Sequence, residues 1–184
     1  MRTEIRFAGF GGQGIIRSGL ITSMAACIYS DKNAVQTQSY GPESRGGSCK
    51  SEVVIADTQI DFPKVDDPDI LIIMSQAAYH KYAGAVKNGT TILVDPDMVR
   101  DRSDPTNAKT YDIPATKIAQ KLGKTIVANV IMLGALAALT NIVSRKAMKE
   151  AILQNIPKGT EELNAAAFRK GYDYGKQLLK IDNS

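Results

Sequence analysis

Residues 3–14 read Thr-Glu-Ile-Arg-Phe-Ala-Gly-Phe-Gly-Gly-Gln-Gly. The first half, Thr3–Ala8, is typical of a short strand, and the second half, Gly9–Gly14, is a glycine-rich turn. The stretch that follows has helical spacing, with apolar residues at Ile16, Leu20, Met24 and Cys27. This strand–turn–helix order predicts an α/β fold. It is also suited to cradling a phosphate, because glycines let an anion approach the N–H groups of a helix N-terminus.

The spacing Gly9-x-Gly11-x-x-Gly14 satisfies the dinucleotide-binding pattern. That pattern also needs an Asp or Glu at the end of the second strand, where it holds the ribose hydroxyls. The second strand is expected over 34–40; it ends without an acid, and Asp31 precedes it. The sequence therefore disfavours a conventional NAD site. It leaves open a site for a phosphate or an acyl carrier, or a tight turn without a ligand.

The composition is that of an ordinary globular protein, with 43% hydrophobic and 23% charged residues in 184. This length predicts a single domain over 1–184 with a substantial core. The net charge of +4 is modest and the cations are scattered, so nucleic-acid binding is not expected. Cys27 and Cys49 have no CxxC spacing and are expected to be packed thiols. With one histidine besides, the chain is expected to ligate neither an iron–sulfur cluster nor a metal.

The termini of the chain and its apolar runs bear on localisation. Met1–Glu4 leads directly into the first strand, without the apolar stretch of a signal peptide. The longest apolar run, 126–139, is interrupted by Asn129 and is too short to span a bilayer. We therefore expect a cytoplasmic protein that does not associate with membranes.

Strand and helix patterns alternate along the rest of the chain. Further strands are expected over 34–40, 49–56, 70–74, 91–95 and 109–113, and helices over 13–30, 77–86, from 114 onward, and over 129–139, 144–155 and 160–179. The gap between the strands at 34–40 and 49–56 is too short for a crossover helix, so this pair is expected to be antiparallel or joined by a wide hairpin. The predicted fold class is α/β, a mostly parallel Rossmann-like sheet with helices on both faces and a helical C-terminal third.

A second unusual segment, Ser39–Ser48, reads Ser-Tyr-Gly-Pro-Glu-Ser-Arg-Gly-Gly-Ser. Gly41-Pro42 favours a turn, and Gly46-Gly47 permits conformations closed to other residues. Arg45 can hold a phosphate or carboxylate through two parallel hydrogen bonds. Alternatively, Glu43 and Arg45 pair with each other or with a neighbour and only hold the loop. Ligands of such sheets bind outside the carboxyl ends of the strands, where we expect both glycine-rich loops.

Four segments occur in a specific order along the chain. They are Gly9-Phe-Gly-Gly-Gln-Gly-Ile-Ile, Gln38-Ser-Tyr-Gly-Pro-Glu-Ser-Arg-Gly-Gly, Pro68-Asp-Ile-Leu-Ile and Asn129-Val-Ile-Met-Leu-Gly-Ala. Each segment alone is common, but the four in this order, with these spacings, are specific. Together they resemble the gamma subunits of the 2-oxoacid:ferredoxin oxidoreductases, and the resemblance extends over residues 3–180.

The resemblance implies oxidative decarboxylation of a 2-oxoacid to acyl-CoA on thiamine diphosphate, with electrons passing through iron–sulfur clusters to ferredoxin. It places thiamine diphosphate and its magnesium on the alpha and beta partner chains. It places the clusters on the beta chain or a small ferredoxin-like delta chain. The present chain has no cluster cysteines and no Gly-Asp-Gly motif for a thiamine-bound magnesium, so it is expected to be inactive alone. Without its partner chains the isolated chain would expose the surface that contacts them, and a homodimer is one expected outcome.

The resemblance also implies that this chain binds or admits coenzyme A, whose pyrophosphate and 3′-phosphate the two loops can meet. Gln13 offers an amide to a ligand or to a facing subunit, and Asn129 either caps the following helix or reaches the same crevice. Alternatively, both loops face the alpha subunit. No catalytic residue and no metal ligand is expected here. The residues expected to bind coenzyme A are Gly11, Gly12, Gln13, Gly14, Tyr40, Glu43, Arg45, Gly46 and Asn129.

The second loop resembles the 2-oxoglutarate-type gamma chains. Pyruvate-type chains tend to carry Arg-Gly-Gly-Gln-Gly in the first loop and Phe-Gly-Pro-Glu-Arg-Arg-Gly in the second, where this chain has Phe10 and Ser44. We therefore expect 2-oxoglutarate as the substrate, with pyruvate and branched-chain 2-oxoacids as alternatives. A freestanding nucleotide-binding regulatory module, indicated by Gly9–Gly14 alone, is the alternative from another functional class.

Overall fold

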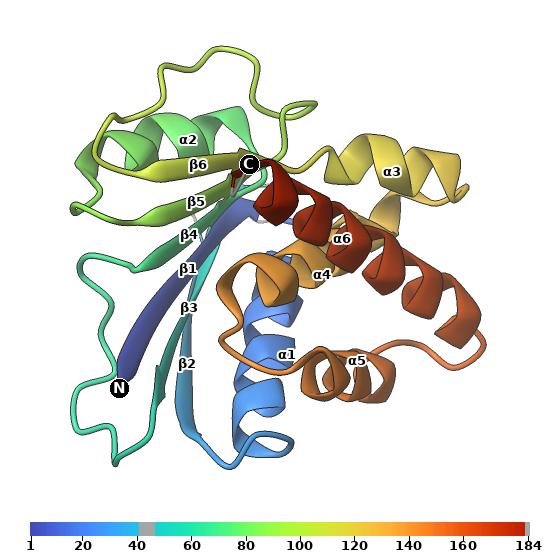
Figure 1. Ribbon diagram of the computed structural model, residues 1–184, viewed down its shortest axis with the longest axis horizontal. Coiled ribbons are helices and arrows are strands. Elements are labelled where there is room, and N and C mark those ends of the chain that lie inside the picture. The colour runs from blue at the N-terminus through green and yellow to red at the C-terminus, as the bar shows by residue number, and fades with distance from the viewer. Residues whose placement is uncertain (41–46, 183–184) are drawn as a thin grey trace.

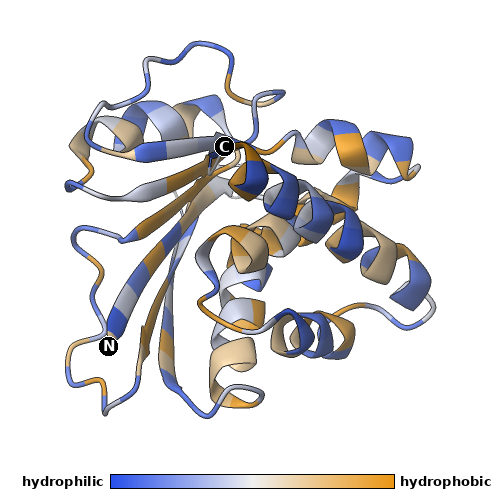
Figure 2. Cartoon of the chain, viewed as in Figure 1, coloured by the Kyte–Doolittle hydropathy of each residue, from blue (hydrophilic) through white to orange (hydrophobic). Residues whose placement is uncertain are grey.

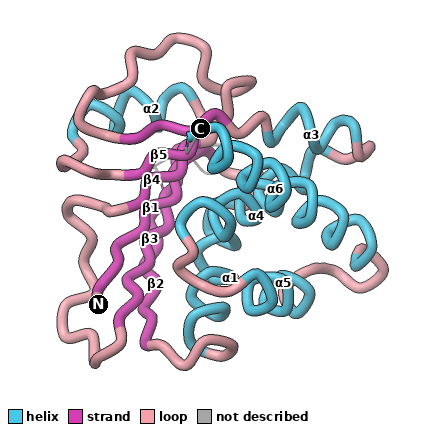
Figure 3. The backbone as a smooth tube through the Cα atoms, in the orientation of Figure 1, coloured by secondary structure: helices cyan, strands magenta, loops and turns pink. Residues whose placement is uncertain are grey.

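The computed structural model describes residues 1–40 and 47–182. Within these ranges, six strands form one sheet in the order β2-β3-β1-β4-β5-β6 (Figures 1 and 3). The strands are β1 Arg2–Phe10, β2 Asn33–Tyr40, β3 Ser48–Ala56, β4 Ile70–Ile73, β5 Thr91–Val94 and β6 Lys109–Asp112. β1, β4, β5 and β6 pair in parallel, while β3 runs antiparallel to both β1 and β2. The predictions of a mostly parallel sheet and of an antiparallel pair after the first helix are confirmed.

Helices cover both faces of this sheet, as predicted, but unequally. The helices are α1 Ile15–Cys27, α2 Gln76–Tyr82, α3 Ala115–Lys121, α4 Ala128–Thr140, α5 Arg145–Gln154 and α6 Glu161–Asp182, with 3₁₀ turns η1 Ala83–Ala85 and η2 Thr125–Val127. The larger core cluster joins one face of the sheet to α1, α3, α4, α5 and α6. A smaller cluster joins the other face to α2 and η1. The helical C-terminal third lies on the more heavily covered face (Figure 1).

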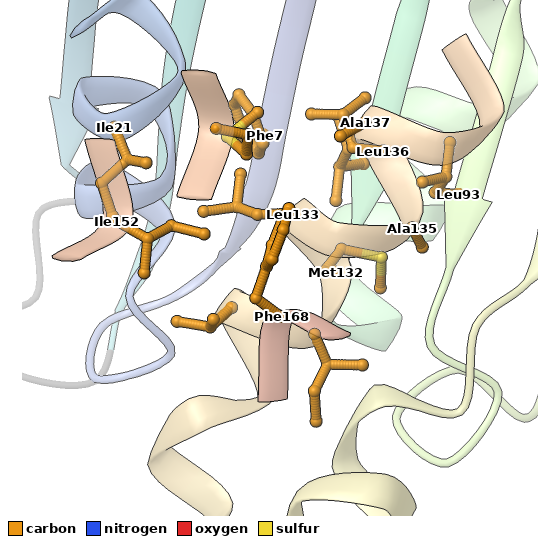
Figure 4. Packing of buried hydrophobic residues seen from close by; sticks show 14 of the residues in the cluster. Phe7, Ile21, Leu93, Met132, Leu133, Ala135, Leu136, Ala137, Ile152 and Phe168 are labelled. Atoms are coloured by element: carbon orange, nitrogen blue, oxygen red, sulfur yellow. The ribbon is translucent and has the colours of Figure 1, made fainter. Parts of the chain in front are cut away.

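The short central strands are apolar because both of their faces are covered. Leu71 and Ile73 of β4 belong to the smaller cluster, whereas Ile72 of the same strand belongs to the larger one. Leu93 of β5 also faces the larger cluster, close to the labelled residues of α4 in Figure 4. The continuous apolar runs of the sequence thus serve two cores at once.

α4 is the central helix of the larger core. It is buried along 128–138 and lies between the sheet and α6, with Leu133 and Phe168 close together in Figure 4. The outer helices are different, since the solvent-facing turns of α5 and α6 are hydrophilic (Figure 2). Glycines bring α4 and α6 into close contact: a Cβ on Gly171 would stand 2.7 Å from the carbonyl carbon of Ile131.

Ser144 and Thr160 stand directly before α5 and α6, whereas one of the two cysteines differs from its prediction. Ser144 precedes α5 and its hydroxyl accepts a hydrogen bond from the Ala147 N–H at 3.1 Å, as an N-cap residue should. Thr160, the first residue of the range expected for the last helix, directly precedes α6, and its hydroxyl donates to the Pro157 carbonyl at 2.6 Å. The prediction that both cysteines are packed is wrong for Cys27, which is exposed because α1 ends there. Cys49 is buried.

Candidate functional site

The glycine-rich loop joins the end of β1 to the start of α1. Gly12 and Gly14 have φ values of +97° and +76°, a backbone region that side chains other than glycine rarely adopt. Gly14 is the N-cap residue of α1, and no side chain of residues 1–40 or 47–182 caps the helix there. The first turn of α1 contains no acid, so its unpaired N–H groups are not neutralised locally. This leaves a partly positive helix end available to an anion.

Gln13 fixes the shape of this loop. Its side-chain carbonyl accepts a hydrogen bond from the Phe10 N–H at 2.9 Å, and its amide nitrogen donates to the Met74 carbonyl at the end of β4. Gly9 leaves room for this arrangement, because a Cβ there would stand 2.8 Å from the Ile15 side chain and would also meet Gln13. Both ends of the Gln13 amide are therefore engaged within the chain. Its predicted contact with a ligand or a facing subunit stays a prediction.

The first glycine-rich loop lies at the carboxyl edge of the sheet, beside Tyr40 and Gly47, the described residues on either side of 41–46. Phe10 of β1 and Tyr40 of β2 are opposite the adjacent residues Ser48 and Cys49 of β3. The Gly11 N–H donates to the Gly47 carbonyl at 2.9 Å and so ties the first loop to the residue that precedes β3. Glu43, Arg45 and Gly46 lie outside the described residues, so their predicted roles stay predictions.

Asn129 is the second residue of α4 and does not cap it. The helix starts at Ala128, directly after η2, and no side chain in the described part of the chain caps its N-terminus. The capping alternative is therefore wrong. The Asn129 side chain lies against the glycine loop instead, because a Cβ added to Gly14 would collide with its amide. The residue is only 5% exposed, yet its amide makes no hydrogen bond to any residue in 1–40 or 47–182 and lines a cleft.

That cleft has a volume of about 710 Å³ and lies between α1, β2, α4 and α6. Its polar lining comes from the loop glycines Gly11, Gly12 and Gly14, from Asn129, and from Arg17, Gln36, Gln38, Tyr40, Lys124, Thr160 and Asn164. Apolar side chains such as Ile16, Leu20 and Leu163 complete it. The cleft therefore brings together five of the residues predicted from the sequence: Gly11, Gly12, Gly14, Tyr40 and Asn129.

The cleft is electropositive. Arg17, in the first turn of α1, and Lys124, before η2, both line it, and neither pairs with an acid in the described part of the chain. No aspartate or glutamate lies among the described lining residues. The N-terminal turns of α1, α4 and α6 all contribute to the wall, although Glu161 and Glu162 in the first turn of α6 stay outside it. Unpaired cations and helix N-termini together favour an anionic ligand.

Sequence reasoning missed Arg17, Lys124 and Asn164. Arg17 carried a usable signal, because it stands three residues after Gly14 and so must project from the first turn of the helix. Lys124 and Asn164 carried none, since each reaches the cleft only through the packing of α4 and α6 on α1. Asn164 is 5% exposed, and its amide nitrogen donates to the Thr160 carbonyl at 2.9 Å.

A second cavity, of about 460 Å³, lies on the other side of the glycine loop. Its lining includes Phe10, Gln13, Met74, Thr116 and Ile126. It lies between the carboxyl ends of β1 and β4. After β1 the chain continues to β2 at one edge of the sheet, and after β4 it continues to β5 and β6 at the other. Ligands of open α/β sheets bind in such crevices. Gly11, Gly12 and Ile126 line both cavities, so the loop forms the ridge between them.

Buried Asp95 holds α3 at the edge of this second cavity. One carboxylate oxygen accepts hydrogen bonds from the Thr116 N–H at 2.8 Å and the Thr116 hydroxyl at 2.6 Å. The other oxygen accepts from the Asp97 N–H at 3.1 Å. Burial raises the pKa of the Asp95 carboxyl, and the hydrogen bonds from Thr116 oppose that rise. With its oxygens so engaged, Asp95 is best assigned a structural role.

The described residues of the site differ from a dinucleotide site and from a metal site. In a dinucleotide fold the second strand pairs with the first and carries the ribose-binding acid, whereas here β3 separates β2 from β1. The part of the chain that the structure describes holds no group of histidine, cysteine, aspartate or glutamate side chains able to bind a metal.

Burial raises the pKa of the Cys49 thiol. None of the described helices is long and apolar enough to cross a membrane.

Residues 4–174 match the family described as pyruvate ferredoxin/flavodoxin oxidoreductase. The chain belongs to this family. The 2-oxoglutarate synthase subunit KorC of Methanocaldococcus jannaschii is 57% identical over 180 residues, covering 97% of this chain and 96% of that subunit. The pyruvate synthase subunit PorC of the same organism is 33% identical over 186 residues, covering 96% and 97%.

Solved structures show the same fold. The gamma subunit of a keto/oxoacid ferredoxin oxidoreductase from Geobacter sulfurreducens PCA has a TM-score of 0.86 at 43% identity, covering 95% of this chain and 97% of that one. The 2-oxoglutarate:ferredoxin oxidoreductase of Magnetococcus marinus, solved with 2-oxoglutarate, coenzyme A and succinyl-CoA bound, has a TM-score of 0.83 at 27% identity. There the match covers 98% of this chain but 31% of the other chain. The predicted membership among the gamma subunits of 2-oxoacid:ferredoxin oxidoreductases is confirmed.

Proposed function

We propose that this chain is the gamma subunit of a 2-oxoglutarate:ferredoxin oxidoreductase and that its electropositive cleft binds coenzyme A. The complex converts a 2-oxoacid and coenzyme A to acyl-CoA and carbon dioxide, and passes two electrons to ferredoxin. Thiamine diphosphate, magnesium and the iron–sulfur clusters belong to the partner alpha, beta or delta chains. The choice of 2-oxoglutarate rests on the higher identity to the KorC subunit than to the PorC subunit.

The observation that carries the proposal is found in one cleft. Two cations without an acidic partner among the described residues meet a helix N-terminus that no described side chain caps. Arg17 and Lys124 supply two positive charges, and α1 offers free N–H groups above Gly14. Coenzyme A carries a pyrophosphate and a 3′-phosphate, which such a site attracts. The apolar and amide lining between them suits the uncharged pantetheine arm, whose amides need partners when desolvated. The buried amide of Asn129 is one such partner.

The geometry separates this chain's role from the redox chemistry. Its described residues hold groups for binding and orientation, and the reacting thiol of coenzyme A must leave the cleft toward a partner chain. The candidate exit lies over the ridge formed by Gly11, Gly12 and Ile126, because these residues line both cavities and Ile126 is 73% exposed.

The test is steady-state kinetics of the anaerobically purified complex. Arg17→Gln should raise the KM for coenzyme A by about tenfold, the effect of losing one charge-assisted hydrogen bond, and leave the KM for 2-oxoglutarate unchanged. Comparing coenzyme A with dephospho-coenzyme A assigns the phosphate: if Arg17 meets the 3′-phosphate, the variant and the wild type should converge on the dephospho compound.

The matched control is Arg169→Gln, which removes the same charge from an exposed position on α6 and should change neither constant. An equal rise in both KM values for Arg17→Gln would place Arg17 at a subunit contact and contradict the coenzyme A assignment. Purification of an active complex that prefers pyruvate would overturn the choice of 2-oxoglutarate. A native chain that purifies alone would overturn the subunit role.

A further inference from the structure

The two edges of the sheet are protected very differently. The β6 edge is only four residues long and carries charges at both ends: Lys109 pairs with Asp182 at 2.7 Å, and Asp112 pairs with Arg102 at 2.6 Å. The Tyr111 hydroxyl also donates to Asp182 at 2.7 Å, so the end of α6 is fixed against this strand. Short, charged and covered edge strands resist pairing with other chains.

The β2 edge has none of these safeguards. It is eight residues long and reads Asn-Ala-Val-Gln-Thr-Gln-Ser-Tyr, without a charge, a proline or a glycine. Within the described residues its one paired neighbour is β3, and its register with β3 runs unbroken from Asn33 to Tyr40 without a bulge. A long, regular, uncharged edge presents a row of backbone donors and acceptors, and these form a template for another strand.

Apolar side chains stand exposed beside this edge. Ile28 and Tyr29, in the turn that leads into β2, are 60% and 37% exposed. Leu20 of α1 is 41% exposed and lines the cleft together with Gln36 and Gln38 of β2. The Cys27 thiol lies 3.7 Å from the Ala34 carbonyl, which shows that the end of α1 is adjacent to β2. An added strand would therefore find apolar surface next to the backbone edge on the helical side of the sheet.

We infer that β2 pairs antiparallel with β2 of a second copy of this chain, joining the two sheets across the edge. A second copy fits better than a charged partner strand because the edge offers no charge to complement. A strand without charges also suffers no like-charge repulsion when it meets itself. The contact is isologous, so each exposed group appears twice around one two-fold axis.

The alternation of side chains limits the registers of this contact. Residues opposite each other in neighbouring strands must point to the same face. A two-fold axis normal to the sheet satisfies this when it sets one residue of β2 opposite its own copy. Gln36 and Thr37 are at the centre of the strand, so an axis beside either of them pairs the most residues. The same axis keeps both copies of α1 on one face of the joined sheet, so Leu20, Ile28 and Tyr29 of both copies lie along one side of the contact.

The inference is independent of the proposed function, because it uses the strand edge and not the ligand. It does place the contact beside the cleft, since Gln36, Gln38 and Tyr40 belong to both β2 and the cleft wall. A second copy would thus stand next to the open side of the cleft.

The test is sedimentation equilibrium of the full chain, with Thr37→Lys as the disrupting variant. Lysine at this position places two positive charges opposite or diagonal to each other across the axis, so the dissociation constant of the dimer should rise at least about tenfold. Gln120→Lys adds the same charge at an exposed position on α3 and should leave the constant unchanged. Circular dichroism establishes that both variants are folded.

Hydrogen exchange at two protein concentrations locates the contact. Amides of β2 should exchange more slowly at the higher concentration, whereas those of β6 should not change. A chain that is monomeric at millimolar concentration, or a dimer that Thr37→Lys leaves intact, overturns the inference. So does slower exchange of β2 that appears only when the partner subunits of the complex are added, because the edge then belongs to one of them.

Discussion

The loop after β1 and the crossing of α4 with α6 both depend on glycine, but for opposite physical reasons. At Gly12 the φ angle is +97° and an added Cβ would meet no described residue within 4 Å, so conformation and ligand approach are what exclude a side chain. At Gly171 the backbone is helical and the space is filled by the backbone of α4 at Ile131. The loop glycines shape a surface that a ligand can approach, whereas the glycines of the helix crossing let α4 and α6 pack closely.

This difference predicts how each region fails. Substitution in the helix crossing should reduce the free energy of unfolding, because two backbones must separate before a methyl group fits. Substitution in the loop should reduce activity more than stability, because the loop lies at the surface and its neighbours can adjust. The expected loss in the free energy of unfolding is therefore largest at the crossing and smallest at the tip of the loop.

Gly171→Ala should have the largest effect. Its methyl group would stand 2.7 Å from the Ile131 carbonyl carbon, an overlap with rigid backbone that should lower the free energy of unfolding by about 3 kcal/mol. The measurement is the urea midpoint at constant m value. Gly84→Ala is the matched control, since Gly84 lies in η1 with nothing within 4 Å of the added carbon. A midpoint for Gly171→Ala equal to that of the control would show that the helices separate without cost.

The sequence predicted the elements well because each is encoded locally. The apolar runs of β4 and β5, the helical spacing of α1 and the short gap before β3 all act within a few residues. Their assembly was predictable to the extent that parallel strands place their carboxyl ends at one edge, which is why the two glycine-rich loops were expected to be neighbours.

The charged lining of the cleft was not predictable in the same way. Lys124 and Asn164 are separated from Gly14 by more than a hundred residues, and no local sequence pattern predicts that they lie near the loop. The cap assigned to Asn129 failed because η2 lets α4 begin one residue earlier, which turns the side chain toward Gly14. Tertiary packing decided these details, and periodicity carries no information on it.

Gly14→Ala should have an intermediate effect, because Gly14 combines both reasons for glycine. Its φ of +76° costs a side chain about 1 kcal/mol, and the added methyl group would also collide with the Asn129 amide. We expect a total loss of about 2 kcal/mol in the free energy of unfolding. In an Asn129→Ala background the collision with the amide is gone and only a tight Cβ–Cβ contact of 3.3 Å remains, so the loss caused by Gly14→Ala should fall to about 1 kcal/mol.

This double-mutant cycle separates the two contributions through its coupling energy, measured from the urea midpoints of the four proteins. A coupling energy near zero would mean that Asn129 simply moves aside. Gly14 would then belong with the conformational glycines of the loop alone.

Gly12→Val should have the smallest effect on stability and a large one on activity. The strain of a valine at φ +97° should lower the free energy of unfolding by about 1–2 kcal/mol, since its Cβ would meet no described residue within 4 Å. Its two methyl groups, however, occupy the ridge between the cavities and keep an anion from the loop backbone. In the assembled complex we therefore expect kcat/KM for coenzyme A to fall by at least about tenfold, which corresponds to about 1.4 kcal/mol of transition-state stabilisation. If Gly12→Val lost the same stability but retained full activity, the loop glycines would be needed only for the conformation of the turn. The two groups of glycines would then differ only in backbone conformation.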